Sequence, residues 1–296
     1  METLNQWQSS GQHFQFEAAD GHQSIFFRST FTGQEREKPA LLLIHGFPTS
    51  SWDWARLWLP LSNHFQLVTL DMLGFGFSSK PQRAYSIFEQ ADIYESLLTH
   101  LGVSQYHILA HDYGDTVTQE LISRHNNQTI RSVIFLNGGL FPETHHPALI
   151  QKILLSPIGK WVGKLSSYKS LQKNFAKICA KPISDTDLKG YWEQIQFNNG
   201  KAVLHLLIHY MNERKQNRER WVGALQQTSV PLGLINGTLD PISGAHMAER
   251  YKSIIPNPVV YELSDTGHYP QVESSEALLE FCLHFWSCQG VSNNTA

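Results

Sequence analysis

Short apolar runs recur along this chain and predict the strands of a single β-sheet. Residues 12–19 and 22–30 alternate between apolar and polar side chains around Asp20-Gly21, which predicts an antiparallel hairpin. Continuous apolar runs follow at residues 40–44, 67–70, 106–109, 133–136, 232–235 and 259–261. Runs this short, separated by helical patterns, are typical of parallel strands that helices cover on both faces. The sequence therefore predicts an α/β fold with a mostly parallel, eight-stranded sheet flanked by helices.

The strand–helix rhythm stops between about residues 141 and 221, where the pattern is helical throughout. Residues 201–212 are expected to form one helix, because apolar residues recur along one face at helical spacing. A helical insertion at this point of the chain would lie over the carboxyl ends of the strands, where open α/β sheets bind ligands. We therefore expect a core domain of residues 1–140 and 222–296 and an inserted helical cap of residues 141–221.

Composition narrows the class of protein. The chain has 296 residues, of which 41% are hydrophobic and 17% charged, as expected for a globular protein. Its formal net charge of −3 predicts no affinity for nucleic acid or for anionic membranes. Three cysteines do not make a disulfide framework, and no secretion signal or membrane anchor is evident, so we expect a cytoplasmic protein. The oligomeric state is left open.

The sharpest chemical signal is the segment Ala110-His111-Asp112-Tyr113-Gly114, directly after an apolar strand. Small residues lie two positions before and after Asp112, and a helix is expected from about Asp115. This spacing is that of a nucleophile elbow, which normally holds a serine. A carboxylate needs no base to attack an alkyl carbon, and the product is an ester on the protein. The alternative is that Asp112 merely caps the helix.

Two residues further along the chain complete a triad with Asp112. His268 follows the last strand in a loop between Gly267 and Pro270, and it is the expected base that activates water. Asp240 follows the strand at 232–235 and is expected to orient His268, although it also opens a turn before Pro241. The order nucleophile, acid, histidine is that of α/β-hydrolases.

An oxyanion hole is expected from backbone amides. One donor should be the amide of Tyr113, and the other the amide of Phe47 in His45-Gly46-Phe47-Pro48. His45 is interpreted as a structural loop residue. The pair His145-His146 is interpreted as a solvated entrance to the cap.

These motifs resemble the α/β-hydrolase superfamily over nearly the whole chain. The segments at residues 45–48 and 111–114, with Asp240 and Gly267-His268, resemble the branch of epoxide hydrolases and haloalkane dehalogenases. Residues 111–121, 137–147, 220–225 and 267–272 are similar to mesoderm-specific-transcript-like proteins. That subgroup is poorly defined in substrate, so the resemblance names a family better than a reaction.

Within this branch the resemblance favours epoxides over halides. Dehalogenases bind halide through an asparagine and a tryptophan at the positions that hold Phe47 and Tyr113 here, and a fluoroacetate-dehalogenase arginine is also missing at 113. Epoxide hydrolases use cap tyrosines to donate a hydrogen bond to the leaving oxygen. Tyr210 matches one of them, and Tyr168 or Tyr191 is a candidate for the other.

The resulting hypothesis is a capped, cofactor-independent hydrolase that opens an epoxide through a covalent ester. Its partners would be a small apolar substrate and water, with no nucleic acid and no metal. One alternative is a haloalkane dehalogenase that uses the same triad. Another is a non-catalytic binding protein that keeps the fold, which the intact set of Asp112, Asp240 and His268 argues against.

Overall fold

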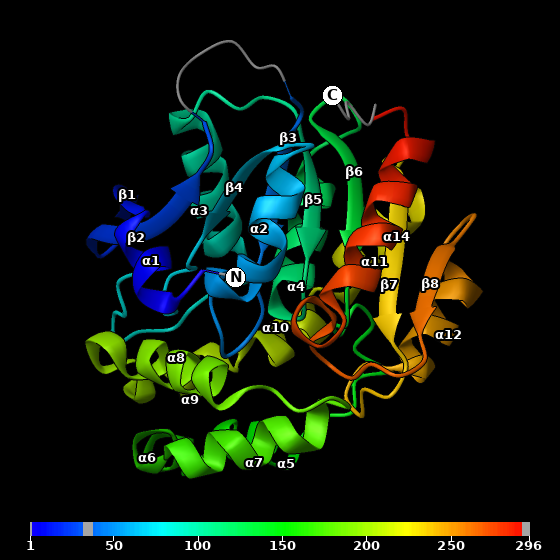
Figure 1. Ribbon diagram of the computed structural model, residues 1–296. Helices are drawn as coiled ribbons and strands as arrows, with labels where there is room; N and C mark the ends of the chain where they lie inside the picture. The colour runs from blue at the N-terminus through cyan, green and yellow to red at the C-terminus, as the bar shows by residue number, and fades with distance from the viewer. Residues whose placement is uncertain (1, 32–37, 292–296) are drawn as a thin grey trace.

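A computed structural model of the chain describes residues 2–31 and 38–291. They form an eight-stranded sheet in the order β1-β2-β4-β3-β5-β6-β7-β8 (Figure 1). The strands that contact β2 run antiparallel to it, and all other neighbours are parallel. The strands are β1 Gln12–Ala18, β2 Gly21–Ser29, β3 Ala40–Ile44, β4 Gln66–Leu70, β5 Tyr106–Ala110, β6 Ile130–Phe135, β7 Leu232–Gly237 and β8 Val259–Leu263. The predicted α/β fold, with its hairpin and mostly parallel sheet, is confirmed.

The central strands are buried on both faces, as their continuous apolar runs predict. In β3, Leu42 and Ile44 pack on one side of the sheet, whereas Leu41 and Leu43 pack on the other. The first side is covered by α3 Ile87–His100, α4 Tyr113–Arg124, α11 Arg218–Gln227 and α12 Ala245–Ile254. The second is covered by α1 Leu4–Ser9, η1 Ser51–Trp54, α2 Ala55–Ser62 and α14 Ser275–Cys288, with the short α13 Pro270–Glu273 preceding α14.

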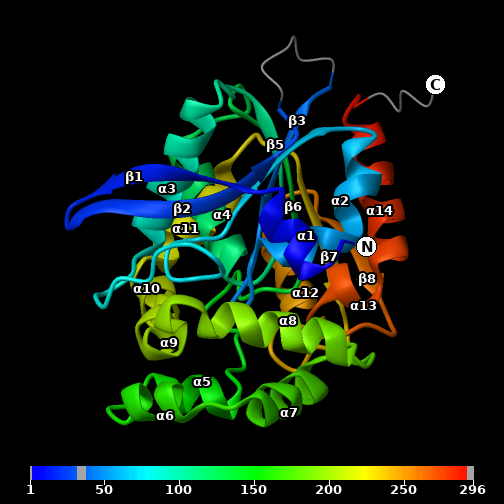
Figure 2. The same ribbon diagram turned by 60° about the vertical axis from the view of Figure 1, so that its left-hand side comes forward.

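A run of helices joins β6 to β7 and lies beyond the carboxyl ends of the strands (Figure 1). Figure 2 shows an outer layer of α5, α6 and α7, with α8 and α9 between that layer and the sheet. We call this run the inserted helices: α5 Leu149–Leu154, α6 Gly159–Leu165, α7 Tyr168–Ile178, α8 Asp185–Gln196, η2 Phe197–Ala202, α9 Leu204–Leu207 and α10 Tyr210–Gln216. The predicted cap boundary at residue 221 falls inside α11, which packs against α4.

Two predictions about helices differ from the structure. Residues 201–212 do not form one helix, because the chain tightens there. The amides of Leu206 and Met211 bond to carbonyls three residues back instead of four, which divides the segment among η2, α9 and α10. Helix α4 begins at Tyr113, slightly before the predicted start at about Asp115, because the turn at Asp112 leads directly into it. None of the described helices is both long enough and apolar enough to cross a bilayer.

Candidate active site

Asp112 occupies the turn between β5 and α4 in a conformation that L residues rarely adopt. Its φ is 49° and its ψ is −104°. Such backbone costs on the order of 1–3 kcal/mol and persists only where the surroundings impose it. The side chain makes no capping bond to α4, contrary to the helix-cap alternative. Its Oδ2 instead accepts a hydrogen bond of 3.0 Å from the Phe47 amide.

Glycines allow the neighbouring backbone to approach this turn. A Cβ at Gly114 would lie 2.5 Å from the Ile44 carbonyl oxygen, and one at Gly46 would lie 2.9 Å from the Asp112 Cβ. Real Cβ atoms do not approach so closely, so larger residues would force the elbow apart. The small residue at 114 in the sequence motif therefore follows from the packing of α4 against the end of β3.

His268 and Asp240 form a buried pair. The Nδ1 of His268 lies 2.7 Å from Oδ2 of Asp240, and each residue is only 3% exposed. Burial opposes the imidazolium, but the charges of Asp240 and Asp112 outweigh it and raise the pKa of His268 to about 9. Burial likewise opposes ionisation of Asp240, yet His268 and further hydrogen bonds lower the pKa of Asp240 to about 2. The pair is therefore ionised near neutral pH.

Asp240 is held on both carboxylate oxygens. Its Oδ1 accepts from the Ile242 amide at 2.8 Å, and its Oδ2 accepts from the hydroxyl of Ser243 at 2.7 Å. Asn137, which follows β6, donates to the same Oδ2 at 3.0 Å. Asp240 therefore both forms the turn around Pro241 and bonds to His268, so its two predicted roles are compatible. Sequence reasoning missed Asn137, whose only signal is its place directly after a buried strand.

His111 ties the elbow to the loop that carries His268. Its Nε2 lies 2.7 Å from the carbonyl oxygen of His268, and its Nδ1 lies 3.0 Å from Nε2 of Gln271. Burial lowers the pKa of His111 well below its ordinary value, so the ring is neutral. A neutral ring that donates from Nε2 and accepts at Nδ1 satisfies both bonds. His111 therefore positions the loop of His268 relative to Asp112.

The two predicted oxyanion-hole amides belong to the loop after β3 and to the first residue of α4. The Phe47 amide already bonds to the Asp112 carboxylate, and the Tyr113 amide is the first of α4, so it has no partner within the helix. His45 supports this loop as predicted. Its Nδ1 bonds to the Gly46 carbonyl and its Nε2 accepts from the Met72 amide, while burial lowers its pKa to about 4.

Tyr210 lies beside the nucleophile position, at the start of α10. Its ring centroid is 4.7 Å from that of Tyr113 and 6.4 Å from that of Phe47. The buried hydroxyl has no hydrogen-bond partner among the described residues. Burial and the charge of Asp112 raise the pKa of Tyr210 above its ordinary value, and the nearby Arg214 opposes the shift. The hydroxyl therefore stays protonated and available as a donor.

The other two tyrosine candidates lie elsewhere. The hydroxyl of Tyr168 bonds to Asp185 near the surface of the inserted helices. Tyr191 is buried, but its ring packs on Trp52 and Phe175, with centroid distances of 5.4 and 5.5 Å. Neither hydroxyl has a recorded contact with Asp112.

A buried polar cluster next to Tyr210 was not predicted. Arg214 donates from Nε to the hydroxyl of Thr116 at 3.0 Å, and its guanidinium lies 4.7 Å from the Tyr210 ring centroid. Burial, with the charge of Asp112, raises the pKa of the Asp115 carboxyl well above its usual range, although Arg214 opposes the shift. The only sequence signal for Arg214 is its i+4 spacing from Tyr210.

His145 also belongs to this cluster, so its interpretation as a solvated entrance is wrong. Both its ring nitrogens are buried, and burial beside Arg214 lowers its pKa to about 3. Only His146 is exposed, and it stacks on His246 with a centroid distance of 4.2 Å.

A cavity of about 150 Å³ leads from the inserted helices to the candidate site. Its inner end is formed by Phe47, Ile242 and His268. The rest of its lining is mostly apolar and includes Leu149, Leu154, Val162, Leu171, Phe175 and Leu204. This lining suits an apolar molecule that must reach a polar centre.

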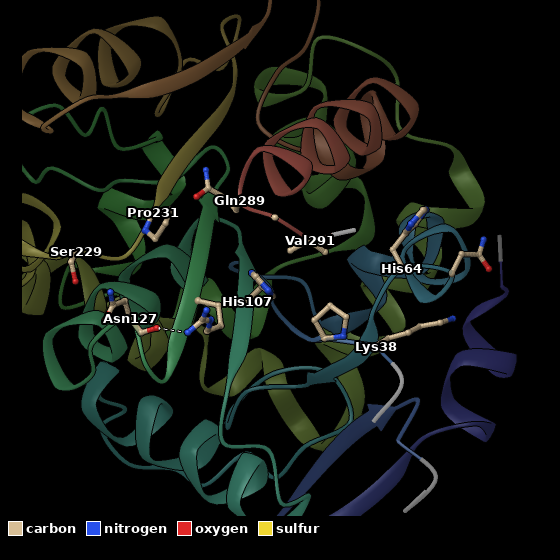
Figure 3. A pocket seen from close by; sticks show the side chains of 12 residues that line it. Lys38, His64, His107, Asn127, Ser229, Pro231, Gln289 and Val291 are labelled. Atoms are coloured by element: carbon tan, nitrogen blue, oxygen red, sulfur yellow. Dashed lines mark hydrogen bonds between the residues drawn. The ribbon is translucent and has the colours of Figure 1, made fainter. Parts of the chain in front are cut away.

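A larger cavity, of about 650 Å³, lies at the opposite end of the sheet (Figure 3). Its lining includes Pro39, His107 and Pro231, which lie at the amino ends of β3, β5 and β7. No member of the predicted triad lines it. Within residues 2–31 and 38–291, no cluster of histidine, cysteine and acidic side chains is arranged to hold a metal ion.

Known proteins that are similar to this chain have the same α/β fold. The α/β hydrolase fold family model matches residues 39–275. A mesoderm-specific transcript homolog protein of Bos taurus is 40% identical over 302 residues, covering 95% of this chain and 87% of that protein. A putative hydrolase, LipZ, of Mycobacterium tuberculosis is 36% identical over 254 residues, covering 83% and 88%. A crystal structure of a haloalkane dehalogenase loop variant from Bradyrhizobium elkanii has a TM-score of 0.78 at 18% identity, covering 95% and 97%.

Proposed function

This chain belongs to the α/β-hydrolase family and is a relative of the mesoderm-specific transcript proteins, and we propose that it hydrolyses a small apolar epoxide through a covalent ester on Asp112. The observation that carries the proposal is the elbow geometry of Asp112, with one carboxylate oxygen held by the Phe47 amide at 3.0 Å. In this proposal the inserted helices act as a cap over the core domain and enclose the substrate.

In the first step, Oδ1 of Asp112 attacks an epoxide carbon and the carbon–oxygen bond breaks. The attack falls to Oδ1 because Oδ2 is engaged by the Phe47 amide. The departing oxygen takes a proton from the Tyr210 hydroxyl, since an alkoxide leaves poorly without an acid. The products of this step are a hydroxyalkyl ester on Asp112 and a Tyr210 phenolate, which recovers its proton through water from the His268 imidazolium and so leaves His268 neutral for the second step.

In the second step, neutral His268 takes a proton from water as the water attacks the ester carbonyl carbon. The carbonyl oxygen is Oδ2, so the developing negative charge forms where the Phe47 amide already donates. The Tyr113 amide is the second donor. Collapse of the tetrahedral intermediate breaks the ester bond, and the leaving alkoxide takes the proton held by His268 to complete the diol. Asp112 is left as a carboxylic acid with one oxygen from water, and it gives its proton to His268, which restores the carboxylate and the imidazolium.

Two features favour an epoxide over a halide. The Phe47 and Tyr113 side chains carry no N–H donor for a halide ion, as the sequence predicts. The buried Tyr210 hydroxyl is available beside Asp112 to protonate a departing oxygen, which a departing halide does not require. A dehalogenase reaction through the same triad is the competing possibility.

The test is to trap the ester. A His268→Gln variant is incubated with hexene oxide or bromohexane, and its intact mass and peptide map are measured. We expect a hydroxyhexyl adduct on Asp112 from the epoxide, and none in the His268→Gln/Asp112→Ala double variant. A hexyl adduct, lighter by one oxygen atom, would instead establish the dehalogenase reaction.

Label from water distinguishes the covalent route from direct hydration. In a single turnover of the unmodified protein in ¹⁸O water, the proposed mechanism leaves label in the Asp112 carboxylate. A labelled diol with unlabelled Asp112 would refute the ester. If wide panels of both substrate classes gave no adduct and no turnover, the non-catalytic binding protein would become the better interpretation.

A further inference from the structure

The outer inserted helices carry a strongly segregated charge. Residues 144–184 contain seven lysines and no arginine, aspartate or glutamate. Because the whole chain has a formal net charge of −3, the remainder carries −10. Residues 144–184 are therefore positively charged, although the net charge of the whole chain is negative.

Six of these lysines are exposed and take part in none of the ion pairs recorded for the described residues. Three of them, Lys169, Lys173 and Lys177, lie four residues apart along one side of α7. The other side of this helix buries Leu171 and Phe175. The seventh, Lys181, is half-buried and pairs with Asp265 at 2.8 Å. The six exposed lysines are Lys152, Lys160, Lys164, Lys169, Lys173 and Lys177.

Helix α6 buries its small residues and exposes its large apolar ones. It buries Gly159 and Gly163, and a Cβ at Gly163 would lie 2.8 Å from the Lys201 carbonyl oxygen. Its large apolar residues point outward instead, with Trp161 64% and Leu165 80% exposed. The close approach at the glycines fixes this orientation. Leu149 and Ile158, at the starts of α5 and α6, are also more than half exposed.

We propose that this basic face, formed by the six lysines with Leu149, Ile158, Trp161 and Leu165, docks on a membrane surface that contains anionic lipid. Exposed tryptophan and leucine among lysines suit the boundary between headgroups and acyl chains. A protein interface fits less well, because the centre of such interfaces is depleted in lysine. Figures 1 and 2 show α5, α6 and α7 as an outer layer, and no other element of residues 2–31 and 38–291 covers that layer from outside.

The cavity that leads toward His268 opens within the same face. Leu149 and Lys177 line the cavity and are exposed, whereas its inner end reaches His268. A docked molecule would therefore present the cavity to the lipid, and an apolar substrate could enter without crossing water. This inference rests on the surface of the inserted helices and holds whether or not the chemistry proposed for Asp112 is right.

The experiment is co-sedimentation of the full chain with vesicles of phosphatidylcholine alone or mixed with phosphatidylserine. We expect binding to the mixed vesicles that weakens with added salt. A Lys164→Glu/Lys169→Glu/Lys173→Glu variant should lose at least about a hundredfold in partition coefficient. The matched control, Arg131→Glu/Lys215→Glu/Lys252→Glu, changes the net charge equally away from the face and should lose far less.

Insertion of the apolar residues is tested by fluorescence. Brominated lipid in the mixed vesicles should quench part of the tryptophan emission, and Trp161→Phe should abolish that part. Equal vesicle binding by both triple variants would overturn the proposal, as would no binding to mixed vesicles at low salt. A lipid-free dimer that dissociates in Trp161→Ser, measured by sedimentation equilibrium, would show that the face joins two copies of this chain instead.

Discussion

Replacing His268 with glutamine should remove a defined part of the pH dependence of stability. The folded protein raises the pKa of His268 from 6.5 to about 9, against the burial of the ring, because Asp240 and Asp112 favour the imidazolium. A shift of this size corresponds to about 3 kcal/mol of differential stabilisation. The shift applies in full because His268 is only 3% exposed.

Because the folded chain raises the pKa of His268, the stabilisation from this residue decreases as the pH rises. Below pH 6.5 the imidazole binds a proton in both the folded and the unfolded chain, so the whole stabilisation is present. As the pH rises to about 9, only the folded chain keeps the proton, and the stabilisation is lost progressively. Asp240 stays ionised over this range, because its pKa is lowered to about 2.

The assay is urea unfolding of both proteins at closely spaced pH values from about 5.5 to about 9.5. The difference in unfolding free energy, unmodified protein minus His268→Gln, should fall by about 3 kcal/mol across that interval. Titration of tyrosines and cysteines is common to both proteins and cancels in the difference. A flat difference, or one that rises with pH, would refute the ionised pair of His268 and Asp240.

Three further changes test other parts of the structure. Tyr210→Phe should slow ester formation at least about a hundredfold and leave ester hydrolysis unchanged, as measured by rapid-quench single turnovers; equal rates of ester formation would exclude Tyr210 as the acid. Gly114→Ala should cost about 2 kcal/mol of unfolding free energy in urea, because its Cβ would lie 2.5 Å from the Ile44 carbonyl oxygen; an unchanged midpoint would mean that the elbow yields. Glu120→Gln should cost about 3 kcal/mol at neutral pH, because the buried carboxylate bonds to two arginines and to the Trp221 indole. Burial opposes ionisation there, but these partners lower the pKa of Glu120 to about 2, so the cost should shrink as the pH falls from 4.5 toward that value, followed by urea unfolding at each pH.

The strands could be predicted because their signal is local. A run such as residues 40–44 contains only apolar side chains, and any sheet covered on both faces buries such a run. The elbow could be predicted for a related reason. Gly114 is required by its close approach to Ile44 and His45 at the end of β3, and the motif of residues 110–114 carries this requirement within five positions of the chain.

The polar cluster behind Tyr210 could not be predicted, because its members come together only in the folded chain. His145 precedes α5, Arg214 lies in α10 and Asp115 in α4. Each has an ordinary exposed interpretation by itself, and only the folded chain buries all three, which raises the pKa of Asp115 and lowers the pKa of His145. The bounds of the inserted helices could not be predicted either, because residues 201–212 have a helical pattern but their tighter hydrogen bonds divide them into separate short helices.

The sequence by itself determined the order of strands and helices, the α/β class, and the chemistry available at Asp112, Asp240 and His268. Those features depend on local periodicity and on residue type. Only the tertiary structure decided that Tyr210 lies beside Asp112 while Tyr168 and Tyr191 do not, and that α6 turns its tryptophan outward. Contacts between distant segments decide which face of a short helix is buried, and a hydrophobic pattern of one or two turns is too brief to specify that choice.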